Sequence, residues 1–258
     1  MAIKALAWMV RTFEPPVYCY HEIVHNKIVV DRFTNRGVIF VNDISEVPRG
    51  KPIMLSAHGS APQVFESARS RGSYMVDSVC PLVTKVHHEV RTRVGKGQKF
   101  PAVWTPGRSD LCFATTNRQA SLTKIAAEVD AMVVIGSANS SNTRALERLA
   151  SDVGCKRVLR VNTAAELPSD LHGTIGVTAG ASAPEELVAA VIDHLAPIAG
   201  VQEVRAVNED EYFPPPRHIR ELQSAIDVAI STMCGAPASD RARYDDHSLS
   251  ASTVLSAL

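Results

Sequence analysis

The chain has 258 residues, enough for one large domain or two of ordinary size, and 45% of its residues are hydrophobic. Its 27 basic and 27 acidic residues balance, so the overall charge does not indicate a surface for nucleic acid or for an acidic membrane. No apolar run approaches the roughly 20 residues of a membrane-spanning helix, and a signal peptide is not indicated, so we expect a cytoplasmic protein.

Short β-branched runs alternate with helical patterns along most of the chain, which predicts an α/β fold of parallel sheets flanked by helices. Strands are predicted over residues 15–20, 37–41, 52–57, 73–78, 131–137, 156–161 and 173–179. Apolar residues at helical spacing predict helices over residues 61–71, 81–94, 115–128, 141–153 and 184–195.

Two breaks divide this pattern into three parts. Glycine and proline cluster near residue 100, where the periodicity is lost, so we predict one α/β lobe over residues 1–100 and another over 101–205. Three consecutive prolines and a helical stripe of Ile and Leu follow, and from Gly235 the residues are small and polar. The segment 206–258 is therefore predicted to be a proline-rich stretch, a helix and a flexible, disordered tail.

The chain has five cysteines, Cys19, Cys80, Cys112, Cys155 and Cys234. Their odd number and wide spacing argue against a disulfide framework and leave metal binding, catalysis or burial as their uses. Cys80 and Cys112 each lie just before a predicted helix, where the helix dipole would stabilise a thiolate. Cys80 also precedes a proline, a context that is found in iron–sulfur ligands. The other three are predicted to be small buried hydrophobic side chains.

Polar residues gather where the predicted strands end, which is the edge at which open α/β sheets bind their ligands. This set comprises His25, His58, Ser140, Ser141, Asn142 and Ser182. Hydroxyl and amide donors suit phosphate oxygens, and protonated histidines would add charge-assisted hydrogen bonds. Ser and Asn are also favoured as helix N-caps. Both roles use the same free N–H groups at a helix start, so the two interpretations remain open and compatible.

The string "HEIVH", residues 21–25, has the spacing of the two ligands and the base of a zinc hydrolase helix. An extended run precedes His21, however, which predicts that His21 and His25 flank a strand-to-helix turn. No further histidine occurs between His25 and His58, so the third ligand of a metzincin is missing. We therefore do not predict a zinc hydrolase.

Several longer strings occur in a defined order along the chain. They are "PPVYCYHEIVHNKIVVDRF", "ISEVP", "LSAHGSAPQV", "VDSVCPLVTKVHHEV", "DLCFATTNRQ", "VIGSANSSNTRAL" and "GVTAGASAPEELV". Each resembles a segment of 4-hydroxy-3-methylbut-2-enyl diphosphate reductase, the IspH or LytB family, from Met1 to about Pro216. The resemblance implies an oxidoreductase of non-mevalonate isoprenoid biosynthesis. It would convert 4-hydroxy-3-methylbut-2-enyl diphosphate to isopentenyl and dimethylallyl diphosphate.

The resemblance also implies a cofactor, partners and site residues. The family binds a [4Fe–4S] cluster through three cysteines at the centre of three α/β lobes, and a ferredoxin or flavodoxin supplies its electrons. Cys80 and Cys112 match two of the three cluster ligands. The diphosphate-binding positions of the family match His25, His58, Ser140, Ser141, Asn142 and Ser182.

Two parts of the family pattern have no counterpart in this sequence. A "Cys-Ala-Gly-Val" turn with the first cluster ligand is expected just before Met1. A whole lobe, with a His, the Glu thought to deliver the proton and a Thr, is expected between Cys80 and Cys112, which are only 32 positions apart. No catalytic residue is therefore identified. The chain is either a reductase abridged by a wrong start codon and a deletion, or a truncated, non-catalytic member, at most a phosphate-binding or interaction module.

Overall fold

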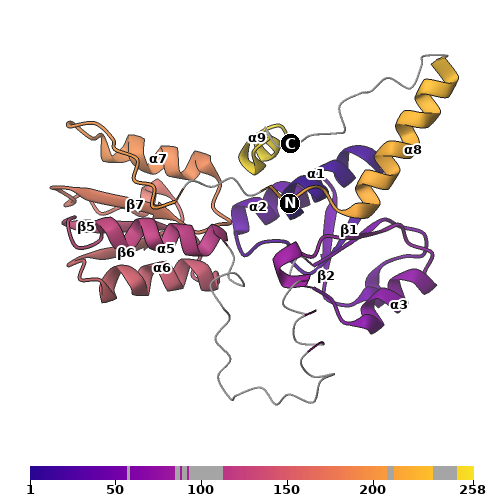
Figure 1. The fold of residues 1–258 in the computed structure, drawn as a ribbon, viewed down its shortest axis with the longest axis horizontal. Coiled ribbons are helices and arrows are strands. Elements are labelled where there is room, and N and C mark those ends of the chain that lie inside the picture. Colours follow the sequence, from indigo (N-terminus) through magenta and orange to yellow (C-terminus); the bar gives the residue numbers. More distant parts are fainter. Residues whose placement is uncertain (57–58, 85–87, 89–91, 93–112, 208–211, 235–248) are drawn as a thin grey trace. The chain divides into compact units, whose positions relative to one another are not determined.

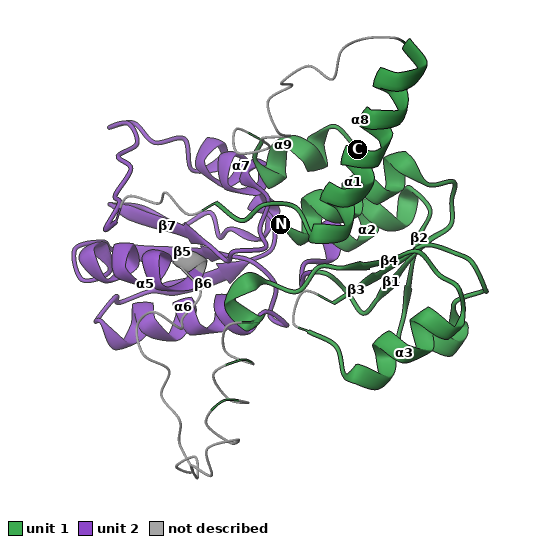
Figure 2. Cartoon of the chain, turned by 45° about the vertical axis from the view of Figure 1, so that its right-hand side comes forward, with its two compact units in different colours: residues 1–23, 30–104, 212–258 green, residues 24–29, 105–211 purple. Residues whose placement is uncertain are grey.

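The structure, a computed structural model, describes every residue except 57–58, 85–87, 89–91, 93–112, 208–211 and 235–248 (Figure 1). The chain forms two compact units, which are coloured separately in Figure 2. Unit 1 comprises residues 1–23, 30–104 and 212–258, and unit 2 comprises residues 24–29 and 105–211. Each unit contains a parallel β-sheet with helices beside it, which confirms the predicted α/β fold.

Unit 1 contains a four-stranded parallel sheet in the order β2-β1-β3-β4. Its strands are β1 (Val17–Tyr20), β2 (Val38–Val41), β3 (Ile53–Leu55) and β4 (Met75–Asp77). Its helices are α1 (Ala2–Thr12), most of α2 (Lys27–Asn35), the 3-10 helix η1 (Ile44–Glu46), α3 (Pro62–Ser70), α8 (Arg217–Cys234) and α9 (Ala251–Ser256). β1 pairs with β2 from Val17 and Val38 to Tyr20 and Val41, so their carboxyl ends meet at one edge.

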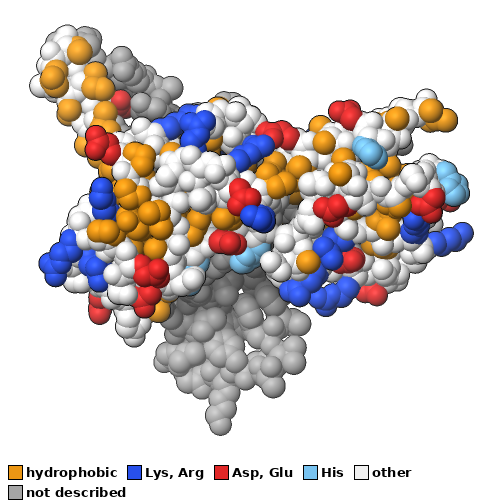
Figure 3. Space-filling model, turned by 180° about the vertical axis from the view of Figure 1, so that it is seen from behind, with side chains coloured by type: hydrophobic (Ala, Val, Ile, Leu, Met, Phe, Trp, Pro, Cys, Tyr) orange, Lys and Arg blue, Asp and Glu red, His pale blue; other side chains and the backbone are white. Residues whose placement is uncertain are grey.

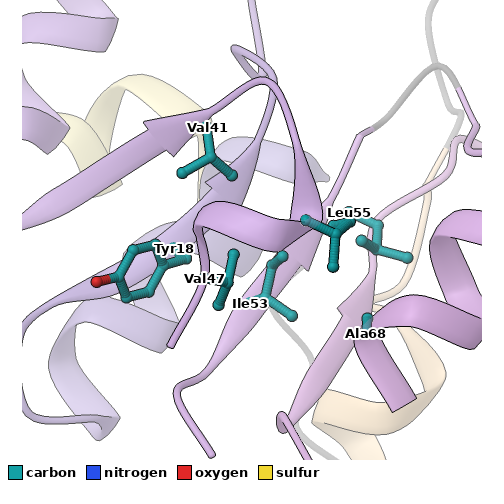
Figure 4. Close-up of a cluster of buried hydrophobic side chains, with 7 residues drawn as sticks. Tyr18, Val41, Val47, Ile53, Leu55 and Ala68 are labelled. Atoms are coloured by element: carbon teal, nitrogen blue, oxygen red, sulfur yellow. The ribbon is translucent and has the colours of Figure 1, made fainter. Parts of the chain in front are cut away.

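The core of unit 1 lies between the sheet and the segment formed by η1 and α3. Ile53 and Leu55 of β3 pack there with Ala68 of α3 in one hydrophobic cluster (Figure 4). Side chains alternate along a strand, so Met54, which is also fully buried, points to the other face. Figures 1 and 2 both show α1 on the opposite side of this sheet from α3. Both faces of the sheet are therefore covered, as is usual for parallel strands.

Unit 2 contains a three-stranded parallel sheet in the order β6-β5-β7. Its elements are α5 (Phe113–Ile125), β5 (Ala131–Ile135), α6 (Ser141–Asp152), β6 (Val158–Val161), η3 (Ala164–Glu166), β7 (Ile175–Ala179) and α7 (Glu185–Leu195). Met132 and Val134 of β5 belong to one hydrophobic cluster with Leu146 of α6. Val133 belongs to a second cluster with Val191 of α7. The central strand is thus buried on both faces, which its unbroken apolar sequence predicts.

Helix α8 is attached to unit 1 at its amino-terminal end. Ile219 is 1% exposed, and the Tyr74 hydroxyl donates a hydrogen bond of 3.1 Å to the carbonyl oxygen of His218. Its distal part exposes the hydrophobic side chains of Ile226, Val228, Ile230 and Met233, at the upper left of Figure 3. No helix in the described part of the chain is long and apolar enough to cross a membrane.

All seven predicted strands are present, each within two residues of its predicted bounds. Helices α1, α2 and α9 were not predicted. A mobile tail was predicted from Gly235, whereas residues 251–256 form α9, which Ser250 caps through a hydrogen bond of 2.9 Å from the Thr253 N–H. The predicted lobe boundary near residue 100 and most of the predicted helix over 81–94 lie outside the described residues.

Candidate functional site

The carboxyl edge of the unit 2 sheet brings two turns together. β5 and β7 are parallel neighbours, and Ile135 pairs with Ala179 at their ends. β5 leads through Gly136 into α6, and β7 leads through Gly180 into α7. The Gly180 N–H donates a hydrogen bond of 2.8 Å to the Ile135 carbonyl, which ties one turn to the other. The predicted residues Ser140, Ser141, Asn142 and Ser182 all lie on these two turns or at the start of α6.

Ser140 is the N-cap of α6. Its Oγ accepts a hydrogen bond of 3.3 Å from the Thr143 N–H, and its own N–H donates to the Ser137 carbonyl at 3.0 Å. Ser140 is only 6% exposed, and Ser141, the next residue, is exposed. The cap uses one free N–H of the first turn, and the remaining ones point beyond the helix start, where an anion is favoured. The cap of Ser140 therefore leaves N–H groups of this turn available, and the predicted capping and anion-binding roles remain compatible.

Two further side chains at the start of α6 contain buried polar atoms without a partner in the described part of the chain. These atoms are Nδ2 and Oδ1 of Asn142 and Oγ1 of Thr143. An unsatisfied buried polar group costs about 1–3 kcal/mol, so folded proteins keep few of them. An anionic ligand at this edge would supply an acceptor for the Asn142 Nδ2 donor.

The two helix starts differ in their electrostatics. α7 has Glu185 and Glu186 in its first turn, directly after Pro184, whereas α6 has no acidic residue in its first turn. Acidic side chains stabilise a helix start but repel a second anion there. Of the two starts, that of α6 is therefore the better place for a phosphate. Ser182, which is partly buried in the other turn, can reach an anion as a neutral hydroxyl donor.

Neither histidine of the "HEIVH" string lies in a helix, since β1 ends at Tyr20 and α2 begins at Lys27. His25 is exposed and belongs to residues 24–29, which group with unit 2. Unit 2 thus holds five of the six predicted diphosphate-binding residues, and the sixth, His58, lies outside the described residues. His21 belongs to unit 1, where its ring packs on Tyr20 and its Nδ1 is 3.3 Å from Asn42 Oδ1.

The cysteines occupy different environments. Cys19 is fully buried in β1, where burial raises the pKa of its thiol, and its Sγ donates to the His21 carbonyl at 3.3 Å. Cys155 is also buried, so the prediction of structural burial is confirmed for these two. The same prediction is wrong for Cys234, which is exposed because it ends the protruding helix α8. Cys80 is partly buried after β4, and its carbonyl accepts from the Thr84 N–H at 3.0 Å.

An iron–sulfur cluster needs several thiolates that converge on one point. Cys112, the second predicted ligand, lies outside the described residues. Within the described ranges, no group of three or more His, Cys, Asp or Glu side chains could hold a metal ion. Because Cys112 lies outside the described residues, binding of a [4Fe–4S] cluster by Cys80 and Cys112 stays a prediction, and we assign no chemical step to a cluster.

Comparison with known proteins decides the family. The sequence model described as LytB protein matches residues 1–103 and 96–196. The chain belongs to the LytB family. A LytB-family enzyme of Methylococcus capsulatus named 4-hydroxy-3-methylbut-2-enyl diphosphate reductase is 32% identical over 297 residues, which cover 86% of this chain and 95% of that protein. A Rhodopseudomonas palustris protein named 4-hydroxy-3-methylbut-2-enyl diphosphate reductase 2 is 34% identical over 292 residues. The match covers 85% of this chain and 91% of that protein.

The fold of the chain is similar to that of a solved structure. That structure is the E-1-hydroxy-2-methyl-but-2-enyl-4-diphosphate reductase from Plasmodium falciparum, with a TM-score of 0.78 and 24% identity. The match covers 87% of this chain and 94% of the Plasmodium chain.

The same comparisons show that this chain is shorter than its LytB relatives in its interior. The alignment with the Methylococcus enzyme has 297 positions, whereas 86% of 258 residues is about 222, which leaves about 75 positions opposite no residue of this chain. The two stretches that match the LytB model meet at residues 96–103, so the family pattern is discontinuous there. This place lies between Cys80 and Cys112, where the sequence predicts a missing lobe.

Proposed function

We propose that this LytB-family protein is a reductase that converts 4-hydroxy-3-methylbut-2-enyl diphosphate to isopentenyl and dimethylallyl diphosphate in non-mevalonate isoprenoid biosynthesis. The support is its similarity to enzymes of that name, which are 32–34% identical over 85–87% of the chain. The reductive half of the proposal, with a [4Fe–4S] cluster and a ferredoxin or flavodoxin donor, rests on family membership alone.

The observation that carries the substrate class is the unpaired amide of Asn142 at the start of α6. In this proposal its Nδ2 donates to a phosphate oxygen, which can only accept hydrogen bonds when it is ionised. The hydroxyls of Ser141 and Ser182 and the free N–H groups of the helix start donate to the remaining oxygens. Since the first turn of α6 has no carboxylate, the dipole of this helix favours the negative charge.

The protonated imidazole of His25 would add a charge-assisted hydrogen bond from the turn before α2. His58 stays a predicted donor on the basis of the family resemblance, since it lies outside the described residues. The proposed role of His25 does not require a helix, so it is compatible with the position of the "HEIVH" string between β1 and α2.

A second candidate is diphosphate binding without turnover. The observation that favours it is the absence of about 75 positions of the Methylococcus reductase, calculated from 297 aligned positions and 86% coverage of the 258 residues. The predicted proton donor of the family lies in the missing lobe, and its loss alone would remove roughly 10²–10⁴-fold of rate. In this case the carboxyl edge of unit 2 would still hold a diphosphate.

One experiment separates the two candidates. The full chain is reconstituted anaerobically with iron and sulfide, its iron and acid-labile sulfide are measured, and it is then assayed with 4-hydroxy-3-methylbut-2-enyl diphosphate and a chemical reductant. Cys80→Ala/Cys112→Ala is the control. The reductase is supported if the chain binds about four irons, the control does not bind them, and product is formed.

Pyrophosphate binding, measured by calorimetry on the same protein, decides the remaining cases. Iron no higher than in the control, together with pyrophosphate binding that Asn142→Ala weakens, favours the second candidate. Absence of both iron and pyrophosphate binding would overturn both.

A further inference from the structure

Thr143 lies between the two turns at the carboxyl edge of unit 2. It is the third residue of α6, and its side chain is 0% exposed. Its N–H is used by the Ser140 cap, but its Oγ1 has no hydrogen-bond partner among the residues that the structure describes. A buried hydroxyl in this situation costs stability, so its presence calls for a reason other than packing alone.

The neighbours of the Thr143 hydroxyl are two glycines. A Cβ atom placed on Gly136, after β5, would lie 2.6 Å from Oγ1 of Thr143. A Cβ atom placed on Gly180, after β7, would lie 2.4 Å from the same oxygen. Both distances are far below normal van der Waals contact, so the hydroxyl fills the space that a side chain on either turn would need.

The two glycines are required for different reasons. Gly136 has a φ of +147°, where an L side chain is strained whatever its surroundings. Gly180 is not among the glycines with a positive φ. Its backbone conformation would therefore accept a residue with a side chain. Apart from Oγ1, an added Cβ at Gly180 would meet Thr143 Cβ at 3.6 Å and the Ile135 carbonyl at 3.7 Å, which are ordinary contacts. The hydroxyl of Thr143 is therefore what excludes a side chain at position 180.

We propose that Thr143 is a positioning residue of the diphosphate site. Its buried hydroxyl sets the distance between two turns, one with Ser140 to Asn142 and the other with Ser182. This inference rests on the proposed diphosphate binding. The Ala183 N–H donates to the Gly180 carbonyl at 2.9 Å, so a displacement of Gly180 moves the turn that contains Ser182. Displacements of about 1 Å are enough to separate donors that must bind one ligand together.

The test is a double-mutant cycle on the full chain, with the affinity for inorganic pyrophosphate measured by calorimetry and the unfolding temperature measured in parallel. Gly180→Ala is expected to weaken pyrophosphate binding by about tenfold or more, because its Cβ displaces the Thr143 hydroxyl. Thr143→Ala/Gly180→Ala removes that clash, so its affinity is expected to recover to within about threefold of Thr143→Ala alone. Thr143→Ser keeps the oxygen and is expected to bind within about threefold of the unmodified chain.

Gly154→Ala is the matched control for a general loss of stability. Gly154 lies just beyond the other end of α6 with a φ of +108° and no atom within 4 Å of an added Cβ. This variant is expected to lower the unfolding temperature through backbone strain and to leave the pyrophosphate affinity unchanged. A Gly180→Ala variant that behaves in the same way would overturn the positioning role of Thr143.

The remaining outcomes are equally decisive. Weakened binding in Gly180→Ala that the double variant does not restore would show that the Thr143 hydroxyl is not the cause. Should Gly180→Ala fail to fold, a double variant that folds and binds pyrophosphate supports the inference, and one that also fails to fold contradicts it. If the unmodified chain does not bind pyrophosphate, the proposed diphosphate site fails and this inference with it. If the unmodified chain binds pyrophosphate and the variants bind it with the same affinity, the positioning role of Thr143 is overturned and the proposed diphosphate site is not.

Discussion

The two parallel sheets of this protein differ in how their carboxyl edges use polar side chains. In unit 1 the Ser78 hydroxyl donates to the Leu55 carbonyl at 2.5 Å, and Asp77 Oδ1 accepts from the Val79 N–H at 3.1 Å. Both side chains form their hydrogen bonds with neighbouring backbone groups, so they stabilise the ends of β3 and β4. The carboxyl edge of unit 1 is in this respect structural.

The corresponding edge of unit 2 contains buried polar atoms that have no hydrogen-bond partner among the described residues. The amide of Asn142 and the hydroxyl of Thr143 have no partner in the described part of the chain. In unit 1, the buried Oγ atoms of Ser60 and Ser73 and the buried Oε1 of Gln223 also have no partner among the described residues, and Ser60 follows β3. Groups of this kind lower stability and are retained where function needs them. The two edges thus differ at the ends of their strands: Ser78 and Asp77 are bonded to backbone in unit 1, whereas Asn142 and Thr143 in unit 2 keep polar atoms that a ligand could use.

The largest effect is expected from the core of unit 2. Leu146 is fully buried against Met132 and Val134, so Leu146→Ala is expected to lower the free energy of unfolding by about 2–5 kcal/mol. Amide hydrogen exchange measures where the protection is lost, and we expect the loss to be greatest in β5, β6 and β7. Leu55→Ala is the matched variant in unit 1. Equal loss of protection in both sheets from either variant would argue against two separate cores.

Asn142→Ala tests the edge of unit 2 directly. Hydrogen bonds to a charged group contribute about 1.5–3 kcal/mol, so the affinity for pyrophosphate is expected to fall by roughly 10- to 100-fold. The ligand-free protein is expected to be as stable as before or more stable, because two unpaired buried atoms are removed. Calorimetry and urea unfolding measure the two effects.

Asn139→Ala, an exposed residue of the same turn, is the control and is expected to change neither property. A clear loss of stability in ligand-free Asn142→Ala would show that the Asn142 amide has a structural role like that of Ser78.

Ser78→Ala should give the opposite result. Ser78 is 0% exposed and bonded, so its replacement is expected to lower the free energy of unfolding by about 1 kcal/mol. The affinity for pyrophosphate is expected to remain unchanged, because this hydroxyl is already occupied by the Leu55 carbonyl. A reduced affinity without a loss of stability would remove the distinction between the two edges.

The strands could be predicted because their signals are local. β5 is an unbroken apolar run with turn residues after it, and Ser140 follows it in the place where a helix cap is expected. Helix α9 could not be predicted in this way, since Leu255 is its one buried residue. It is fixed by distant contacts, among them a hydrogen bond of 3.0 Å from Arg11 to the Ala257 carbonyl. A six-residue helix held by such contacts has almost no sequence signal of its own.

The same distinction applies to the candidate site. Ser141, Asn142 and Ser182 were predicted from their positions after strands, whereas the contact of Thr143 with Gly180 joins residues that are distant in the sequence. Gly180 directly follows the predicted strand 173–179, and Gly136 lies near the end of the predicted strand 131–137; glycines at these positions were a signal that could have indicated a close approach of the turns. The partner of that approach depends on the pairing of β5 with β7, which periodicity does not reveal.

The smallest effect on stability is expected at the amino edge of the unit 2 sheet, where Arg157 and Asp170 form an ion pair. Arg157 donates to both carboxylate oxygens of Asp170, at 3.1 and 2.8 Å, and this hydrogen bonding lowers the pKa of Asp170. Because the folded pKa is below the unfolded value of about 3.9, the pair stabilises the fold above that pH. The stabilisation is lost as the pH falls through the folded pKa. Both side chains are partly or largely exposed, so the contribution is small.

Asp170→Asn is therefore expected to lower the urea midpoint slightly at pH 7 and to match the unmodified chain at the acid end of the titration. Glu203→Gln, in the more exposed pair with Arg205, is the control and should have a smaller effect at every pH. A difference that grew in acid would reverse the sign derived from the lowered pKa of Asp170. Neither substitution is expected to alter pyrophosphate affinity, because Arg157 precedes β6 and the candidate site follows β5 and β7. A change there would mean that the two edges of this sheet are coupled through the strands.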